Sequence, residues 1–102
     1  MSVLMNFAMF PTDKGSSVSE FVSRVVKMIS ETGFDYKLTA MGTIVETETL
    51  PQALEIVDKA YALLEKDSHR VYCSANFDIQ TNKPMGRMAG KIKSVEEKTN
   101  NR

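Results

Sequence analysis

Two polar residues in an otherwise apolar run are the first candidates for chemistry. Thr43 and Glu46 belong to the segment Thr43-Ile44-Val45-Glu46, whose composition is typical of a β-strand. A glutamate opposes strand preference, so its presence needs a reason. Glu46 is either an exposed edge residue, or a carboxylate held beside a cleft to accept hydrogen bonds from, or balance the charge of, a cationic ligand.

Two asparagines and two tyrosines offer further polar or aromatic contacts. Asn6 and Asn76 lie in apolar or β-rich runs. They either satisfy each other, close an oligomer interface or hydrogen-bond a ligand, and the pattern leaves all three open. Tyr36 and Tyr72 suit stacking on a flat ring and packing in a core or interface equally well.

The only cysteine and the only histidine lie four residues apart. A single cysteine, Cys73, excludes internal disulfides and cysteine-rich metal clusters. His69 and Cys73 fall in one predicted strand, where four residues span ~13 Å, too far for a thiolate–imidazole pair. One histidine does not make a typical histidine-based metal site. We therefore predict that Cys73 packs in the core, and we expect no metal site, no catalytic residue and no enzymatic activity.

Composition bounds the class of protein. The 102 residues are 42% hydrophobic and 25% charged, which fits one globular domain over residues 1–102. Thirteen Lys and Arg balance thirteen Asp and Glu, which removes the broad electrostatic drive toward nucleic acid or an anionic membrane. The apolar N-terminal run lacks a basic leader and a cleavage site, so we interpret it as a strand and expect a cytoplasmic protein.

Hydrophobic periodicity predicts seven elements. Alternation at period two predicts strands over residues 3–10, 36–40, 43–48 and 69–79, the middle two joined as a hairpin through Gly42. Helical spacing predicts helices over 17–32 and 50–66, each opened by a capping box at Ser17 or Thr49. Gly33 is expected to end the first helix as a left-handed cap. A short terminal helix is predicted over 85–95, and a frayed tail over 96–102.

This order of elements predicts an α+β protein. It is the ferredoxin-like βαββαβ sandwich, with two helices on one face of a four-stranded antiparallel sheet and an extra C-terminal helix. The opposite face carries Leu4, Ala8 and Phe10 and is partly apolar. Such a surface usually meets another protein surface or a ligand. We therefore expect a homo-oligomer built through sheet faces or edges, a two-fold dimer by default, with a dimer of dimers as the larger alternative.

Several segments together resemble a known family. The most specific is the run from Tyr36 to Glu46, which reads Tyr-x-Leu-x-x-Met-Gly-Thr-x-x-Glu. With segments 15–21, 33–35, 69–71 and 91–95, it resembles the small thiamine-binding domain family, related to YkoF-type proteins, over nearly the whole chain. The resemblance implies a ferredoxin-like fold, commonly a homotetramer, that binds thiamine or a related pyrimidine without chemistry. It assigns ligand binding to Ser19, Tyr36, Met41, Thr43 and Glu46.

The resemblance also suggests roles for these residues. Glu46 balances the thiazolium cation, Tyr36 offers it an aromatic face, and Thr43 gives the pyrimidine edge a donor and acceptor. Thiamine is then a bound ligand, and no cofactor is expected. A regulatory or assembly module, whose sheet face serves oligomerisation with no small-molecule ligand, is the alternative. An enzyme acting on a small heterocycle is least favoured, because no base–nucleophile pair has a workable spacing.

Overall fold

The predicted α+β fold is confirmed by the computed structural model, which describes residues 1–15 and 18–100. The strands pair antiparallel in the order β2-β3-β1-β4, so β1 and β3 are central and β2 and β4 form the edges. The elements are β1 Ser2–Pro11, α1 Ser19–Ser30, β2 Tyr36–Thr39, β3 Gly42–Thr47, α2 Leu50–Glu65, β4 Val71–Gln80 and α3 Arg87–Asn100.

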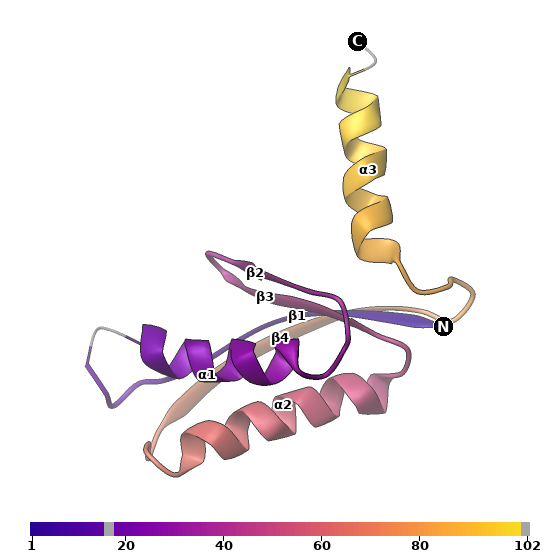
Figure 1. Ribbon diagram of the computed structural model, residues 1–102. Helices are drawn as coiled ribbons and strands as arrows, with labels where there is room; N and C mark the ends of the chain where they lie inside the picture. Colours follow the sequence, from indigo (N-terminus) through magenta and orange to yellow (C-terminus); the bar gives the residue numbers. More distant parts are fainter. Residues whose placement is uncertain (16–17, 101–102) are drawn as a thin grey trace.

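The core lies between the sheet and the pair α1 and α2, which cover one face of it (Figure 1). Every second residue of β1 points to these helices and is 6% exposed or less, as its alternation predicts. Burial of such side chains is the main driving force for folding. The buried apolar side chains are Val3, Met5, Phe7, Met9, Val25, Ile29, Val45, Ala53, Ile56, Ala60 and Leu64.

The helix ends follow the sequence signals only in part. The capping box of α2 is confirmed, because Thr49 Oγ1 accepts from Gln52 N–H at 3.3 Å and Gln52 Oε1 accepts from Thr49 N–H at 3.1 Å. Gly33, at φ +83°, has the predicted left-handed conformation after α1. Helix α1 begins at Ser19. Its N-cap residue is Val18, whose side chain makes no capping hydrogen bond. The predicted cap at Ser17 lies outside the described residues.

Strand β4 departs from its predicted burial. Cys73 was expected in the core, but it is exposed, and Phe77 and Ile79 on the same face are 38% and 43% exposed. The cause is position: β4 is an edge strand, and on its helix-facing side only Val71 and Ala75 pack against the core. The strand also begins at Val71, which leaves His69 in the preceding loop.

Helix α3 is longer than its predicted range and projects from the sheet on the side away from α1 and α2 (Figure 1). Residues 96–100, expected as a frayed tail, continue the helix, and the tail positions 101–102 lie outside the described residues. Lys and Glu are good helix formers, and they outweigh the cost of Gly90. Two side chains of its apolar stripe are exposed, Ile92 by 43% and Val95 by 64%.

Candidate functional site

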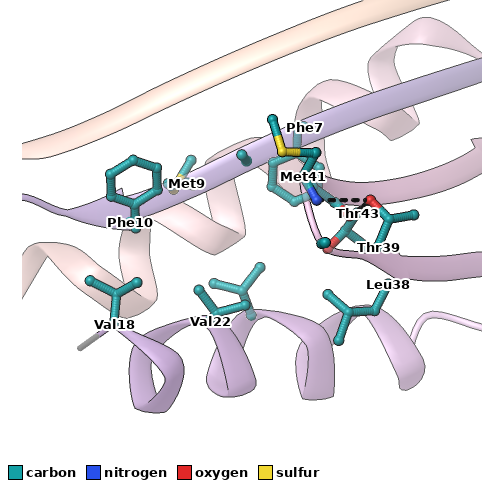
Figure 2. A pocket seen from close by; sticks show the side chains of 13 residues that line it. Phe7, Met9, Phe10, Val18, Val22, Leu38, Thr39, Met41 and Thr43 are labelled. Atoms are coloured by element: carbon teal, nitrogen blue, oxygen red, sulfur yellow. Dashed lines mark hydrogen bonds between the residues drawn. The ribbon is translucent and has the colours of Figure 1, made fainter. Parts of the chain in front are cut away.

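A cavity of about 370 Å³ lies between α1, β1 and the β2–β3 hairpin, and we call it the hairpin pocket. Val18 and Val22 point into it from α1, while Leu38 and Thr43 close it from the hairpin (Figure 2). Its volume lies within the range of small-molecule sites, roughly 300–1,000 Å³. The lining residues carry no charge; they are Phe7, Ala8, Met9, Phe10, Val18, Val22, Val25, Leu38, Thr39, Ala40, Met41, Gly42 and Thr43.

Two threonine hydroxyls supply the polar side-chain atoms of this pocket. Thr39 Oγ1 donates to the Gly42 carbonyl at 2.8 Å and accepts from Met41 N–H at 3.2 Å, so it shapes the hairpin turn (Figure 2). Thr43 is 5% exposed, and its hydroxyl makes no hydrogen bond with the described residues. The Thr43 hydroxyl is therefore available to a ligand as donor and acceptor.

The position of the hairpin tip depends on glycine. A Cβ atom on Gly42 would lie 2.8 Å from Asn6 Oδ1 and 3.0 Å from the Phe7 carbonyl oxygen. Both contacts are closer than carbon and oxygen normally approach, so a larger residue would push the hairpin away from β1. Gly42 thus allows the close approach that gives the pocket its wall.

The structure brings together only some of the residues named by the resemblance. Met41 and Thr43 line the hairpin pocket, Met41 at its rim with 86% exposure. Ser19 lines an adjoining hollow that shares Val22 and Leu38 with the pocket. Tyr36 is 40% exposed on the edge strand β2 and is not among the residues lining the pocket.

Glu46 lies on the other side of the sheet from Thr43. Residues three apart in a strand point to opposite faces, and Thr43 and Val45 take the helix-facing side. Glu46 is 0% exposed on the opposite face, where it accepts from Ser2 Oγ at 2.5 Å. It also accepts from the backbone N–H groups of Gly86 at 3.0 Å and Arg87 at 3.1 Å. This carboxylate therefore binds the segment that opens α3.

Arg87 completes this group, which we call the α3 anchor: the buried residues Ser2, Glu46 and Arg87, with the partly exposed Asp78. Its Nε donates to Ser2 Oγ at 3.0 Å, and its Nη2 donates to the carbonyls of Ser2 at 2.8 Å and Asp78 at 2.7 Å. Its Nη1 lies 3.2 Å from the Asp78 carboxylate. The Arg87 side chain is 7% exposed, so its charge is held by these contacts instead of by water.

The α3 anchor also sets the ionisation of Glu46. Burial by itself would raise the pKa of Glu46, because a charged group loses its hydration. The hydrogen bonds from Ser2 and from the backbone N–H groups of Arg87, Met88 and Gly86 outweigh this effect, and the pKa of Glu46 lies below its ordinary value. Glu46 is therefore an anion at neutral pH.

The described residues offer little for catalysis. Although Cys73 is exposed, neighbouring atoms partly desolvate its thiol and raise its pKa, which disfavours a thiolate nucleophile. The backbone N–H of His69 donates to the Asp13 carboxylate at 2.8 Å, in the loop before β4.

Within residues 1–15 and 18–100, no three His, Cys, Asp or Glu side chains cluster as metal ligands do. The same ranges contain no helix with the length and apolar character that crossing a membrane requires.

The sequence patterns missed two features of this region. Val18 and Val22 form the pocket wall on the α1 side, but in the sequence they have the helical spacing of ordinary core residues. The hydrogen bonds of Glu46 to Gly86 and Arg87 join positions 40 and 41 residues apart, so no local pattern signals them. One feature of the sequence did indicate that Thr43 and Glu46 belong to different sites. They are three residues apart, and this places their side chains on opposite faces of a strand.

The fold and the hairpin pocket define a small α+β domain with an apolar, uncharged cavity. The family model for thiamine-binding protein matches residues 5–96, so the chain belongs to this family. A UPF0045 protein of Methanothermobacter thermautotrophicus is 32% identical over 84 residues, which cover 81% of this chain and 84% of that protein.

Solved structures agree with this assignment of fold. The hypothetical protein MJ1052 of Methanocaldococcus jannaschii has a TM-score of 0.83 at 26% identity, covering 94% of this chain and 97% of that one. A protein from Thermotoga maritima, described as a putative thiamine biosynthesis/salvage protein (TM0486), has a TM-score of 0.75 at 19% identity. That match covers 90% of this chain and 99% of the other, and it supports the fold alone.

Proposed function

We propose that this protein binds thiamine or a related pyrimidine in the hairpin pocket, without chemistry. The observation that carries the proposal is an apolar cavity of about 370 Å³ lined by Thr43, whose hydroxyl makes no hydrogen bond with the described residues. Family membership supplies the class of ligand. An apolar cavity with a few polar groups is the usual design of a site for a flat heterocycle.

The absence of charge among the lining residues decides how thiamine would enter. Thiamine joins a neutral aminopyrimidine to a cationic thiazolium, and burying a cation without a counter-charge is costly. The aminopyrimidine therefore enters the apolar cavity, and the thiazolium stays at the rim near Met41, which is 86% exposed. In this arrangement Glu46 acts in the α3 anchor, and Tyr36 and Ser19 lie outside the ligand's first contacts.

Binding without catalysis is the role that this pocket supports. General acid–base or nucleophilic catalysis needs an ionisable or nucleophilic side chain within hydrogen-bond reach of the reacting atoms. The thirteen residues that line the pocket include none with such a side chain beyond the two threonine hydroxyls (Figure 2). The weak acidity of a hydroxyl without an adjacent base makes it a hydrogen-bonding group only.

Isothermal titration calorimetry with thiamine, on the wild-type chain and on Thr43→Val, tests the proposal. Valine keeps the shape of threonine and removes the hydroxyl, so we expect roughly five- to tenfold weaker binding, the usual worth of one net hydrogen bond. Thermal denaturation should give the same midpoint for both chains within about 2 °C. Absence of heat with thiamine and with its pyrimidine moiety, on a folded chain, would contradict the proposal.

The same proposal includes self-association. Helix α3 exposes Ile92 and Val95, and the open sheet face carries the Phe10–Tyr72 aromatic pair, whose ring centres lie 5.5 Å apart. Apolar surfaces of this kind commonly meet a second subunit. These features also favour the assembly module as second candidate. Sedimentation velocity should give at least twice the mass of one chain, and a monomer at tens of micromolar would exclude this part of the proposal.

A further inference from the structure

One edge of β1 loses its partner strand inside the hairpin pocket. Strand β4 pairs with β1 along its whole length, from Ser2 to Pro11. Strand β3 pairs only with residues Val3 to Phe7, because the hairpin turns at Ala40 and Met41, just before β3 begins at Gly42. Beyond Phe7, the β3-facing edge of β1 has no ladder partner among the described residues, and residues 7–10 of this edge line the pocket.

Two contacts determine which backbone groups point to this edge. The N–H and C=O of one residue in an antiparallel strand point to the same neighbour, and the side alternates from residue to residue. Thr12 N–H donates to the Arg70 carbonyl at 2.9 Å, so even-numbered residues point to β4. A Cβ on Gly42 would lie 3.0 Å from the Phe7 carbonyl oxygen, so odd-numbered residues point to β3.

This alternation leaves Met9 as the residue whose backbone is unpaired in the pocket. Its N–H and C=O point to the side where β3 has already ended, while its side chain is 6% exposed in the core. The next residue with the same orientation is Pro11, which has no N–H group and so leaves no donor unpaired. Proline is tolerated in a strand at such an unpaired edge position. Met9 therefore presents one donor and one acceptor, closely spaced, to the cavity.

We propose that the backbone N–H and C=O of Met9 bind the aminopyrimidine edge of the ligand, an inference that rests on the proposed function. A 4-aminopyrimidine carries an amino donor beside a ring-nitrogen acceptor, the reverse of the pair that Met9 offers. The amino group donates to the Met9 carbonyl, and the ring nitrogen accepts from the Met9 N–H. Main-chain hydrogen bonds at a free strand edge are a recurrent means of recognition. Thr43 then adds a side-chain contact across the same cavity (Figure 2).

Amide hydrogen exchange, followed by NMR on the ¹⁵N-labelled free chain, tests the free edge. Met5 and Phe7 are matched controls, because they point to the same edge but are paired with β3. We expect the Met9 amide to exchange at least ~10 times faster than either control, and to slow toward their rates when thiamine is added. Exchange at Met9 as slow as at Phe7 in the free chain would overturn the inference.

A ligand pair tests the donor–acceptor match. Oxythiamine replaces the 4-amino group by a carbonyl oxygen, which reverses the hydrogen-bonding edge and leaves the thiazolium unchanged. We expect it to bind at least ~30-fold more weakly than thiamine, because the buried Met9 groups would face like partners. Equal affinities would overturn the inference while leaving the proposed function in place. Failure of both compounds to bind would overturn the proposed function and, with it, the role assigned to Met9.

Discussion

Replacing Arg87 by alanine is expected to lower the free energy of unfolding by about 3–5 kcal/mol, because each acceptor left without its donor costs about 1–3 kcal/mol. The Arg87 side chain is 7% exposed and donates to Ser2 Oγ and to two backbone carbonyls of the α3 anchor. Its removal leaves these three acceptors without their donor, including Ser2 Oγ, which itself donates to the Glu46 carboxylate. Urea denaturation followed by circular dichroism measures the loss.

Arg24→Ala is the matched control, because it removes the same side chain from two ion pairs at the surface. Arg24 pairs with Glu20 at 2.9 Å and with Asp67 at 2.8 Å, and its side chain is 38% exposed. Exposed pairs of this kind contribute little, so we expect a loss below about 1 kcal/mol. Equal losses of unfolding free energy in the two variants would show that burial of the α3 anchor contributes nothing to stability. Arg87→Lys should recover little, because lysine lacks the planar fork that reaches three acceptors.

The pH dependence of stability checks the same anchor. The folded-state pKa of Glu46 lies below its ordinary value, so protons bind more readily to the unfolded chain. The stabilisation by ionised Glu46 is therefore present above the ordinary carboxyl pKa of 4.5 and is lost as the pH falls below it, through the lowered folded-state pKa. Glu46→Gln should flatten this acid dependence. Part of the acid dependence should remain in this variant, because the hydrogen bond from Lys91 also lowers the pKa of Asp78.

The sequence predicts the fold well because its signals are local. The alternation of Val3, Met5 and Phe7, the capping box at Thr49 and the left-handed Gly33 are each decided by residues a few positions apart. The four strands and three helices follow from such signals and from the right-handed crossover rule. The burial of β4 was predicted wrongly because alternation identifies a face but not whether a helix covers it, and Cys73 lies at an edge.

The candidate site is harder to predict, since it depends on contacts between distant segments. The hairpin pocket exists because β3 is shorter than β1, and strand length is less certain than strand position in a sequence. The run from Tyr36 to Glu46 pointed to the right hairpin, and Met41 and Thr43 line its pocket. Glu46 contacts a segment 40 residues away, so its partners were invisible to any local pattern.

Filling the hairpin pocket is expected to weaken ligand binding strongly while leaving the fold intact. Val22 is half-buried on α1 and points into the cavity (Figure 2), so Val22→Trp would place an indole where the ligand's ring would lie. A built-in clash of this kind excludes a ligand without removing any contact of the sheet. We expect thiamine to bind on the order of 100-fold more weakly, equivalent to about 2.7 kcal/mol. Calorimetric titration measures the change.

Val26→Trp controls for the bulk of the substitution. Val26 lies one turn further along α1 and is partly buried, but it lines the adjoining hollow and not the hairpin pocket. Both variants should keep the helical circular dichroism signal of the wild-type chain, because tryptophan is tolerated in helices at a cost below about 1 kcal/mol. Strong loss of binding in Val22→Trp with wild-type affinity in Val26→Trp assigns the ligand to the hairpin pocket. Wild-type affinity in both variants would move the ligand elsewhere, and the assembly module would then be the better account of this chain.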